Sequence, residues 1–448
     1  MDIYFIYATT IFALSYIAII SDKIHKTKVV LVGASLMLVC NVLTQHEAFY
    51  EEALGIDYNV IFLLIGMMII VNIFSKTGIF QYLAIKSAKL AKGEPFRIMI
   101  IFALITAFAS ALLDNVTTVL LLVPVILLIA AELEIDPIPF IFSVIFASNI
   151  GGTATLIGDP PNIMIASKLS LTFMDFIYHL TPAILIILPF FFLMMKLMFG
   201  KGLHVKEELK ERIMNMDEND LIKDSRLLIK SLIVFVMVVT GFVLHGLLHL
   251  ELATIAMAGA GLLLLISGEE TEDVFRGVEW PTIFFFIGLF IIVGGIVKVG
   301  LVTKLSDAMV VLTNPSPDNM FITTTVMLWL SAFCSAIIGN IPYVATMIPM
   351  TTEMANNVFS PDLGYETAIN QAGMMPVWWA MALGACLGGN GSLVGASANV
   401  VAIGMAEKAG VSISFGKFLI YGVPVMMLTL VISMLYIWLR YYYLQIYI

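Results

Sequence analysis

The sequence contains little charge and little cysteine for its length. Only 12% of its 448 residues are Asp, Glu, Lys or Arg, whereas 60% are hydrophobic and the mean hydropathy is +1.01. A soluble globular domain carries roughly twice that share of charged residues, so the composition excludes this class and indicates a membrane protein. The three cysteines, Cys40, Cys334 and Cys386, are scattered and provide neither a disulfide framework nor a thiolate metal site.

The sequence also lacks a catalytic set of nucleophile, base and orienting group. We therefore expect no enzymatic activity and no cofactor. The net charge of −9 says little about the partners of a membrane protein. The expected partners are the lipid bilayer and a small inorganic ion, with no nucleic acid.

Long apolar segments predict an all-α polytopic membrane protein with about ten full spans, each able to cross a hydrocarbon layer of ~30 Å. The first segment is interpreted as a retained span and not a signal peptide, because its lysines follow it and do not precede it. The predicted spans are residues 3–20, 29–45, 58–75, 139–166, 180–199, 229–249, 252–267, 279–298, 373–405 and 416–439.

Positive charges predict the orientation in the cell membrane. With both termini outside, nearly every Lys and Arg lies on the cytoplasmic side, as the positive-inside rule requires. The exceptions are Lys168, Lys298, Lys304 and Arg440. This arrangement holds only if two further apolar stretches, residues 98–131 and 320–352, do not cross the membrane.

Those two stretches carry the same sequence cassette. FASALLDNVTTVLLLVP begins at Phe108 and FCSAIIGNIPYVATMIP begins at Phe333, so that Asn115 corresponds to Asn340. We interpret each stretch as a re-entrant helical hairpin, with Asp114-Asn115 or Gly339-Asn340 at its tip. Hydrocarbon cannot satisfy the backbone groups of such a tip, so we expect both tips to line a protein-enclosed site. Its predicted substrate- or ion-binding residues are Asp114, Asn115, Thr117 and Asn340.

A glycine-rich interruption follows each cassette. The two interruptions are GGTATLIGDPPN at residues 151–162 and GGNGSLVGASAN at residues 388–399. Glycine and proline disfavour a continuous helix, so the spans 139–166 and 373–405 are predicted to be broken helices with unwound centres. Unwound carbonyls suit a cation and half-helix N-termini suit an anion. The predicted binding groups of the two interruptions are Gly152, Thr153, Thr155, Asp159, Asn162, Gly389, Asn390, Ser392 and Asn399.

The similarity extends beyond the cassettes, and it predicts two inverted repeats. Ile65–Phe80 resembles Ile287–Val302, yet the charge distribution makes the first segment run inward and the second outward. The first repeat is predicted to comprise residues 1–199 and the second residues 229–448. The charged segment 200–228 between them is expected to be a cytoplasmic linker.

Two carboxylates distinguish the first repeat from the second. Asp114 lies at a hairpin tip and Asp159 in an interruption, where an ionisable residue within the membrane indicates function. Burial penalises the charged form of a carboxyl, so both are predicted proton carriers. The alternative is a capping role, in which Asp114 accepts a bond from the amide of Val116 or Thr117. The corresponding residues of the second repeat, Gly339 and Ala396, carry no acid.

Other polar and aromatic positions are interpreted as interfacial. His245, His249 and Glu251 are expected near an outer membrane edge and not in a metal site, because a metal needs at least three converging ligands. Trp378 and Trp379 are expected to anchor the chain at the outer interface. No bound metal is therefore predicted, apart from a coupling Na⁺ as described below.

Four strings resemble the ion transporter superfamily, specifically the branch of the ArsB arsenite pumps and the P-protein-like permeases. They are LLDNVTTVLLLVPV, ASNIGGTATLIGDPPNIMIAS, GNIPYVATMIPM and GACLGGNGSLVGASANVVAIGMAEKAG. The resemblance covers nearly the whole chain and implies two inverted repeats, a scaffold part and a moving transport part, an elevator mechanism and a homodimer. It also maps Asn115 and Asn340 onto the hairpin tips of dicarboxylate and sodium symporters.

The resemblance implies a secondary active transporter, and proton-coupled efflux of arsenite or antimonite is the first expectation. Neutral arsenite is expected to bind Asn115, Thr155, Asn340 and Ser392, while Asp114 or Asp159 carries the proton. The alternatives are a sodium/proton antiporter and a sodium-coupled anion permease of the dicarboxylate type, with Na⁺ at Asn115, Thr155 and Asn340. A membrane receptor or scaffold that transports nothing would need no paired broken helices.

Overall fold

The computed structural model describes residues 3–21, 23–51, 53–200, 205–215, 221–317, 319–359 and 365–447. Throughout these ranges the secondary structure is helical, apart from an isolated bridge between Ser316 and Asn319. Nine of the helices found there are long and apolar enough to cross a membrane. The α-helix satisfies its own backbone groups, as a chain in hydrocarbon must. The predicted all-α polytopic fold is confirmed.

In the described residues, the first half of the chain contains eleven helices, and the charged linker contains a further short helix. The helices of the first half are α1 (Ile3–Ser21), α2 (Lys26–Val39), α3 (Gln45–Tyr50), α4 (Tyr58–Ser75), α5 (Ile79–Leu90), α6 (Pro95–Leu112), α7 (Asn115–Glu132), α8 (Ile138–Gly152), α9 (Pro160–Leu169), α10 (Phe173–His179) and α11 (Thr181–Phe199). The linker contains α12 (Glu207–Met214).

The second half repeats this order and ends with a π-helical turn. Its elements are α13 (Ser225–Leu248), α14 (Leu252–Ser267), α15 (Thr271–Arg276), α16 (Trp280–Lys298), α17 (Leu301–Thr313), α18 (Phe321–Ile338), α19 (Asn340–Phe359), α20 (Tyr365–Ile369), α21 (Met375–Gly388), η2 (Gly389–Gly391), α22 (Ser397–Lys408), α23 (Phe415–Ile437) and η3 (Trp438–Tyr443). Each predicted span overlaps one helix or a broken pair, but the predicted span 29–45 is wrong in its bounds, because α2 begins at Lys26 and ends at Val39.

Each repeat contains a helical hairpin with a tight turn. In the first, α6 ends at Leu112, and Asp114 caps the start of α7 by accepting a hydrogen bond from the Thr117 amide at 2.9 Å. In the second, Gly339 separates α18 from α19 with φ of +95°, a conformation that favours glycine. The two repeats therefore make the same turn by different means, a capping acid in one and a glycine in the other.

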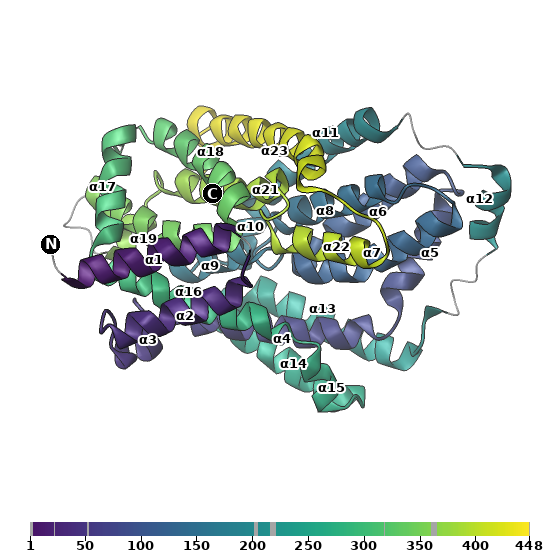
Figure 1. Ribbon diagram of the computed structural model, residues 1–448, viewed down its shortest axis with the longest axis horizontal. Helices are drawn as coiled ribbons and strands as arrows, with labels where there is room; N and C mark the ends of the chain where they lie inside the picture. Colours follow the sequence, from purple (N-terminus) through teal and green to yellow (C-terminus); the bar gives the residue numbers. More distant parts are fainter. Residues whose placement is uncertain are drawn as a thin grey trace.

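The two hairpins enter the protein from opposite ends. In Figure 1, α6 and α7 extend inward from the end near α5 and α12, whereas α18 and α19 extend inward from the end near α17. Likewise, α4 leads toward α5 at one end and α16 leads toward α17 at the other. The repeats are thus inverted, as predicted, and their hairpins point toward one another.

The broken helices form the centre of the molecule. α8 is buried from Phe140 to Gly152, and α21 is buried from Pro376 to Gly388. They lie against the first helix of their own hairpins at backbone distance: a Cβ on Gly151 would lie 2.1 Å from the Ala107 carbonyl oxygen, and one on Gly388 would lie 2.5 Å from that of Ala332. Small residues permit this approach without a hydrophobic driving force.

The two repeats are related by a pseudo-two-fold axis, and helices of each repeat pack against helices of the other. α2 packs against α16 and, correspondingly, α14 packs against α4. Glycines again allow close contact, because a Cβ on Gly66 would lie 2.8 Å from the Ala256 carbonyl carbon and one on Gly288 would lie 2.9 Å from that of Val30. The hairpins are exchanged too, since α7 packs on α22 and α19 packs on α9.

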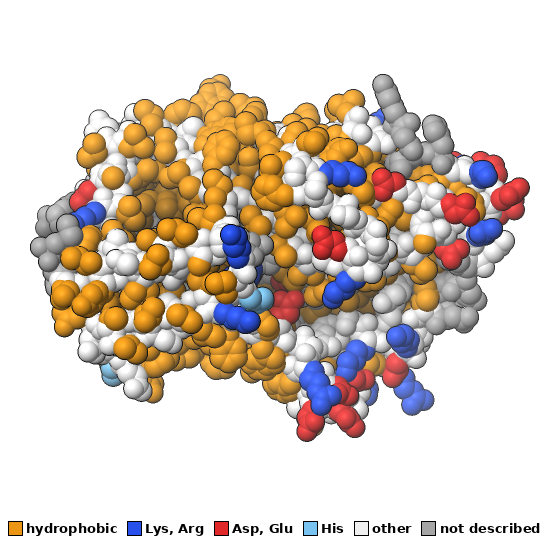
Figure 2. Space-filling view, viewed as in Figure 1, with side chains coloured by type: hydrophobic (Ala, Val, Ile, Leu, Met, Phe, Trp, Pro, Cys, Tyr) orange, Lys and Arg blue, Asp and Glu red, His pale blue; other side chains and the backbone are white. Residues whose placement is uncertain are grey.

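Two groups of helices result from this packing. α1, α2, α4, α13, α14 and α16 pack mainly on one another, whereas the hairpins pack on the broken helices; we refer to these as the outer group and the central group. Figure 2 shows an apolar surface over most of one face, with charged side chains concentrated near the end that carries α12 and α15. This distribution agrees with a protein that spans a membrane along its long axis.

One interfacial prediction is wrong. The side chains of Trp378 and Trp379 are 0% and 1% exposed, so they lie inside the protein and not at its boundary with lipid and water. The Trp379 ring stacks on His179 with ring centroids 4.8 Å apart, and the Trp378 indole donates to the Ile369 carbonyl at 3.1 Å. The sequence places both near a span end, but α21 is surrounded by other helices.

Candidate functional site

The second hairpin tip bonds directly to the first helix break. The Nδ2 atom of Asn340 donates to Oδ1 of Asp159 at 3.0 Å and to Oδ2 at 3.2 Å. Both side chains are buried, and Asp159 is 0% exposed. Asn340 is held by its own Oδ1, which accepts from the Ile341 amide at 2.9 Å, and by its backbone amide, which donates to the Gly395 carbonyl at 3.1 Å.

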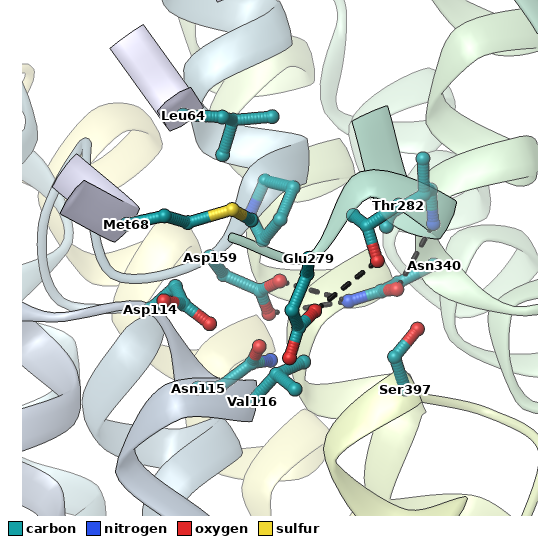
Figure 3. A pocket seen from close by; sticks show the side chains of 12 residues that line it. Leu64, Met68, Asp114, Asn115, Val116, Asp159, Glu279, Thr282, Asn340 and Ser397 are labelled. Atoms are coloured by element: carbon teal, nitrogen blue, oxygen red, sulfur yellow. Dashed lines mark hydrogen bonds between the residues drawn. The ribbon is translucent and has the colours of Figure 1, made fainter. Parts of the chain in front are cut away.

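A cavity lies between the two tips, with an empty volume of about 370 Å³ that includes space open to solvent. Carboxylates, amides and hydroxyls converge on it from both repeats (Figure 3). Its lining consists of Leu64, Met68, Asp114, Asn115, Val116, Asp159, Pro160, Glu279, Thr282, Asn340, Ile341 and Ser397. The structure therefore brings together predicted site residues from three segments that are distant in sequence: Asp114 with Asn115, Asp159, and Asn340.

Asp114 both caps a helix and faces this cavity. Its Oδ1 accepts from the Thr117 amide at 2.9 Å, and its Oδ2 accepts from the Thr117 hydroxyl. Asp114 also lines a second, largely apolar cavity together with Leu63, Met67, Ile157 and Ile163. The predicted capping bond is present, and it leaves the carboxylate accessible from the cavity. The capping and proton-carrying roles are thus geometrically compatible.

The unwound breaks are held together by asparagine amides. Asn162 Nδ2 donates to the carbonyls of Thr153 at 3.2 Å and Thr155 at 2.8 Å. In the second repeat Asn399 Nδ2 donates to those of Gly389 at 2.7 Å and Ser392 at 2.9 Å. These side-chain amides donate hydrogen bonds to backbone carbonyls that lose their helical partners where the helix unwinds.

The two hydroxyls predicted to bind substrate join each break to its own hairpin. Thr155 Oγ1 donates to the Ala111 carbonyl, and Ser392 Oγ donates to the Ala336 carbonyl. Gly152 lies against Gly158 within the first break, since a Cβ there would be 2.6 Å from the Gly158 carbonyl oxygen. These groups hold the shape of the breaks, while the cavity is lined by Asp159 and by the residues at the tips.

Asn149 links the two repeats at the centre, and it is not among the residues that the sequence predicts for the site. Its Nδ2 donates to Oδ1 of Asn390 and to Oδ1 of Asn399, each at 2.9 Å, and its Oδ1 accepts from Asn115 at 3.3 Å. The repeat alignment places Cys386 opposite Asn149, and the Cys386 thiol correspondingly donates to Asn162 Oδ1 at 3.6 Å. A polar residue two positions before the Gly-Gly pair was the available signal.

Glu279 and Lys26 were also not identified. Glu279 precedes α16 and accepts from the Thr282 hydroxyl at 3.2 Å, and Lys26 Nζ donates to Ser397 Oγ at 2.5 Å. Both looked like ordinary charges flanking a span. The sequence repeat indicated Glu279, because its counterpart Asp57 is also an acid at the start of a span. In the structure, Asp57 contacts the central group by accepting a hydrogen bond from the Ser167 hydroxyl at 2.5 Å.

The site contains no preformed metal cage among the described residues, in which no group of three or more His, Cys, Asp and Glu side chains is close enough to hold an ion. Two inverted repeats, paired hairpin tips and broken helices around a cavity that carboxylates and amides line define a multi-pass membrane transporter. A family model described as "Citrate transporter" matches residues 16–384. The chain belongs to this family of transporters.

Individual relatives agree with this membership. An uncharacterized transporter of Mycobacterium tuberculosis is 45% identical over 435 residues, covering 97% of this chain and 98% of that protein. The P protein of Homo sapiens is 32% identical over 505 residues, covering 96% of this chain and 59% of that protein. The crystal structure of the Alcanivorax borkumensis YdaH transporter has a TM-score of 0.55 at 15% identity, covering 85% of each chain; this likeness concerns the fold.

Proposed function

We propose that this chain is a proton-coupled secondary transporter of the cell membrane that exports a small inorganic solute, with arsenite or antimonite as the first candidate. The observation that supports this most strongly is the bond between Asn340 and Asp159. It places a buried carboxyl of one repeat in contact with the hairpin tip of the other, so that proton binding acts directly on the contact between the repeats.

The chemistry of the cavity favours a neutral solute over a free polyanion. Asp114, Asp159 and Glu279 all line it, and like charges disfavour an anion without a companion cation. Undissociated arsenous acid, As(OH)₃, offers hydroxyls that donate to carboxylates and accept from the amides of Asn115 and Asn340. The proton is carried by Asp159 or Asp114, and the second repeat provides no acid at the equivalent positions.

The central group, with its hairpins and broken helices, moves against the outer group in this proposal. Among the described helices, the two groups contact each other mainly through α4 with α7 and α9, α16 with α19, and α1 with α18. Such weak contact suits rigid-body motion of one part past another. Both termini face the outside, the charged linker faces the cytoplasm, and two chains form the assembly.

A second candidate is the transport of a carboxylate together with a cation, either Na⁺ or H⁺. The description of the matching family names citrate, and the ammonium of Lys26 bonds to a residue of the cavity wall. In that case a cation at Asn115 and Asn340 would compensate the carboxylates. A sodium/proton antiporter would use the same acids without any organic solute.

Proteoliposomes with imposed proton or sodium gradients distinguish these candidates. Uptake of arsenite, Na⁺, phosphate, dicarboxylates and citrate is measured for the unmodified protein and for Asp159→Asn. The proposal expects arsenite flux driven by the proton gradient and lost in the variant. Flux of citrate alone, driven by either gradient, would replace the first candidate with the second. No gradient-driven flux of any of these solutes would refute proton-coupled export.

A further inference from the structure

We propose that Lys26 is an internal counter-cation of the transport cavity. In the unloaded protein its ammonium ties the outer group to the start of α22, and loading of the cavity with protons or with solute releases it. This inference rests on the proposed proton-coupled function, and it assigns the residue that prevents the empty transporter from moving.

The first observation is the position of the ammonium between the two groups of helices. Lys26 is the first residue of α2 and Ser397 the first residue of α22, and Nζ donates to Oγ at 2.5 Å. Ser397 lines the cavity. The Lys26 ammonium also lies 5.2 Å from the centre of the Phe285 ring, on the helix that packs against α2. The Lys26 side chain thus connects the outer group to a cavity residue of the central group.

The second observation is the charge that this ammonium faces. Glu279 lies at the start of α16, between the two tips in Figure 3, and it lines the same cavity as Ser397, the residue to which the Lys26 ammonium donates. Across the cavity lie Asp114 on α7 and Asp159 before α9, while Lys23, His25 and Lys28 belong to the segment of Lys26 itself. Carboxylates that share a cavity repel one another, and a nearby ammonium offsets part of that repulsion.

The third observation is that this arrangement exists on one side of the pseudo-two-fold only. The repeat alignment places Leu252 opposite Lys26 and Pro160 opposite Ser397. On that side the acid Asp57 itself crosses to the central group, by bonding to Ser167 at 2.5 Å. A lysine is therefore not needed to build the fold, because the second copy of the same packing is built without one.

If binding of either protons or solute releases Lys26, the protein exchanges protons for solute and does not leak protons. Protonation of Asp114, Asp159 or Glu279 removes negative charge that holds the ammonium at the cavity. A bound solute that takes the hydroxyl of Ser397 removes its hydrogen-bond acceptor. The empty, deprotonated state keeps both interactions, so only a loaded protein can move its central group, as an antiporter requires.

The test compares Lys26→Met with Lys28→Met, which removes a neighbouring ammonium of the same helix, and with Lys26→Arg. Proton leakage into proteoliposomes is measured with a pH-sensitive dye, with no solute present. Lys26→Met is expected to leak about five-fold faster or more, the size of a weak coupling energy. Lys28→Met and Lys26→Arg should leak like the unmodified protein. Equal leakage of Lys26→Met and the unmodified protein would overturn the inference.

A second measurement does not depend on transport. The amines of Lys26 and Lys28 are acylated in the purified protein by a water-soluble reagent, and their rates are compared by mass spectrometry. We expect the acylation rate of Lys26 to be about one fifth of that of Lys28 or lower. In the double variant Ser397→Ala/Glu279→Gln, the Lys26 rate should rise toward that of Lys28. If the unmodified protein transports nothing in the solute panel, the proposed function fails while this measurement still decides the contact. Equal rates in the unmodified protein would refute the tie itself.

Discussion

Asn340 and Asp159 are 181 positions apart in the chain, yet the amide of one donates to both carboxylate oxygens of the other at 3.0 and 3.2 Å. One residue belongs to the hairpin tip of the second repeat and the other to the helix break of the first. Any change in the charge of Asp159 therefore acts on the contact between the repeats.

Asp159→Asn is expected to abolish the response of transport to a proton gradient. A hydrogen bond to a charged group contributes about 1.5–3 kcal/mol, so we expect the gradient-driven rate to fall by roughly ten-fold to a hundred-fold. Initial rates in proteoliposomes measure this. The control is Asp307→Asn on the exposed surface of α17, which should leave the rate unchanged. A rate in Asp159→Asn that still follows the proton gradient would contradict the prediction.

Substitutions of Asp114 can separate the effect of its negative charge from the effect of its capping hydrogen bond. Asparagine is as good an N-cap as aspartate, so Asp114→Asn should change the free energy of unfolding by less than about 0.5 kcal/mol while removing a proton carrier. Asp114→Ala loses the bond to the Thr117 amide and should cost about 1 kcal/mol more. Thermal unfolding in detergent and proton-driven flux are measured on both variants. If both variants showed the same proton-driven flux as the unmodified protein, Asp114 would have only the capping role.

Gly151→Ala and Gly388→Ala should destabilise the protein by about 1–3 kcal/mol each, because the added methyl has no room. The new Cβ would lie 2.1 Å from the Ala107 oxygen in one case and 2.5 Å from the Ala332 oxygen in the other. The matched control is Gly404→Ala in α22, where nothing lies within 4 Å; it should be neutral or stabilise the helix by up to about 1 kcal/mol. Thermal unfolding with the three variants side by side checks this ordering.

An ion pair between Glu47, outside the spans, and Lys298, at the end of one, predicts a small dependence of stability on pH. Glu47 of α3 accepts from Lys298 and from the backbone of Thr44, each at 2.7 Å. These bonds, that with Lys298 first, lower the pKa of Glu47 from 4.5 to about 2. The stabilisation is therefore complete above pH 4.5 and is lost as the pH falls toward 2.

Glu47→Gln should lower the unfolding midpoint at neutral pH by about 1–2 °C, since solvent screens an exposed pair. The difference between the variant and the unmodified protein should shrink as the pH falls below 4.5. Thermal scans over this pH range measure it. A difference that grows toward acid would show that the sign of the linkage is wrong.

Much of the fold was predictable because a membrane restricts the choice of structure. Long apolar segments have to be helices, and the duplicated cassette located both hairpins before any contact was known. Asp114 and Asn115 were predictable for the same reason, since charge and amides at a hairpin tip contrast with an apolar surrounding.

The remaining site residues could not be predicted, because their positions in the site depend on which helices pack against each other. Glu279 and Lys26 lie at span ends, where charges are common, and only the packing of α2 against α16 turns them toward the cavity. Trp378 and Trp379 were assigned to the interface by their type, and the burial of α21 on all sides overrides that preference. Asn149 resembles any polar residue in a helix until the second repeat supplies Asn390 and Asn399 as its partners.

The imperfect repeat has a kinetic consequence. Leu252 stands where the other copy has Lys26, and Gly339 stands where the first copy has Asp114. A transporter with identical halves would show the same half-saturating concentration from either face of the membrane. Here the two faces should differ, and detailed balance then fixes the ratio of maximal rates in the two directions. Right-side-out and inside-out vesicles should therefore follow different saturation curves while reaching the same final gradient.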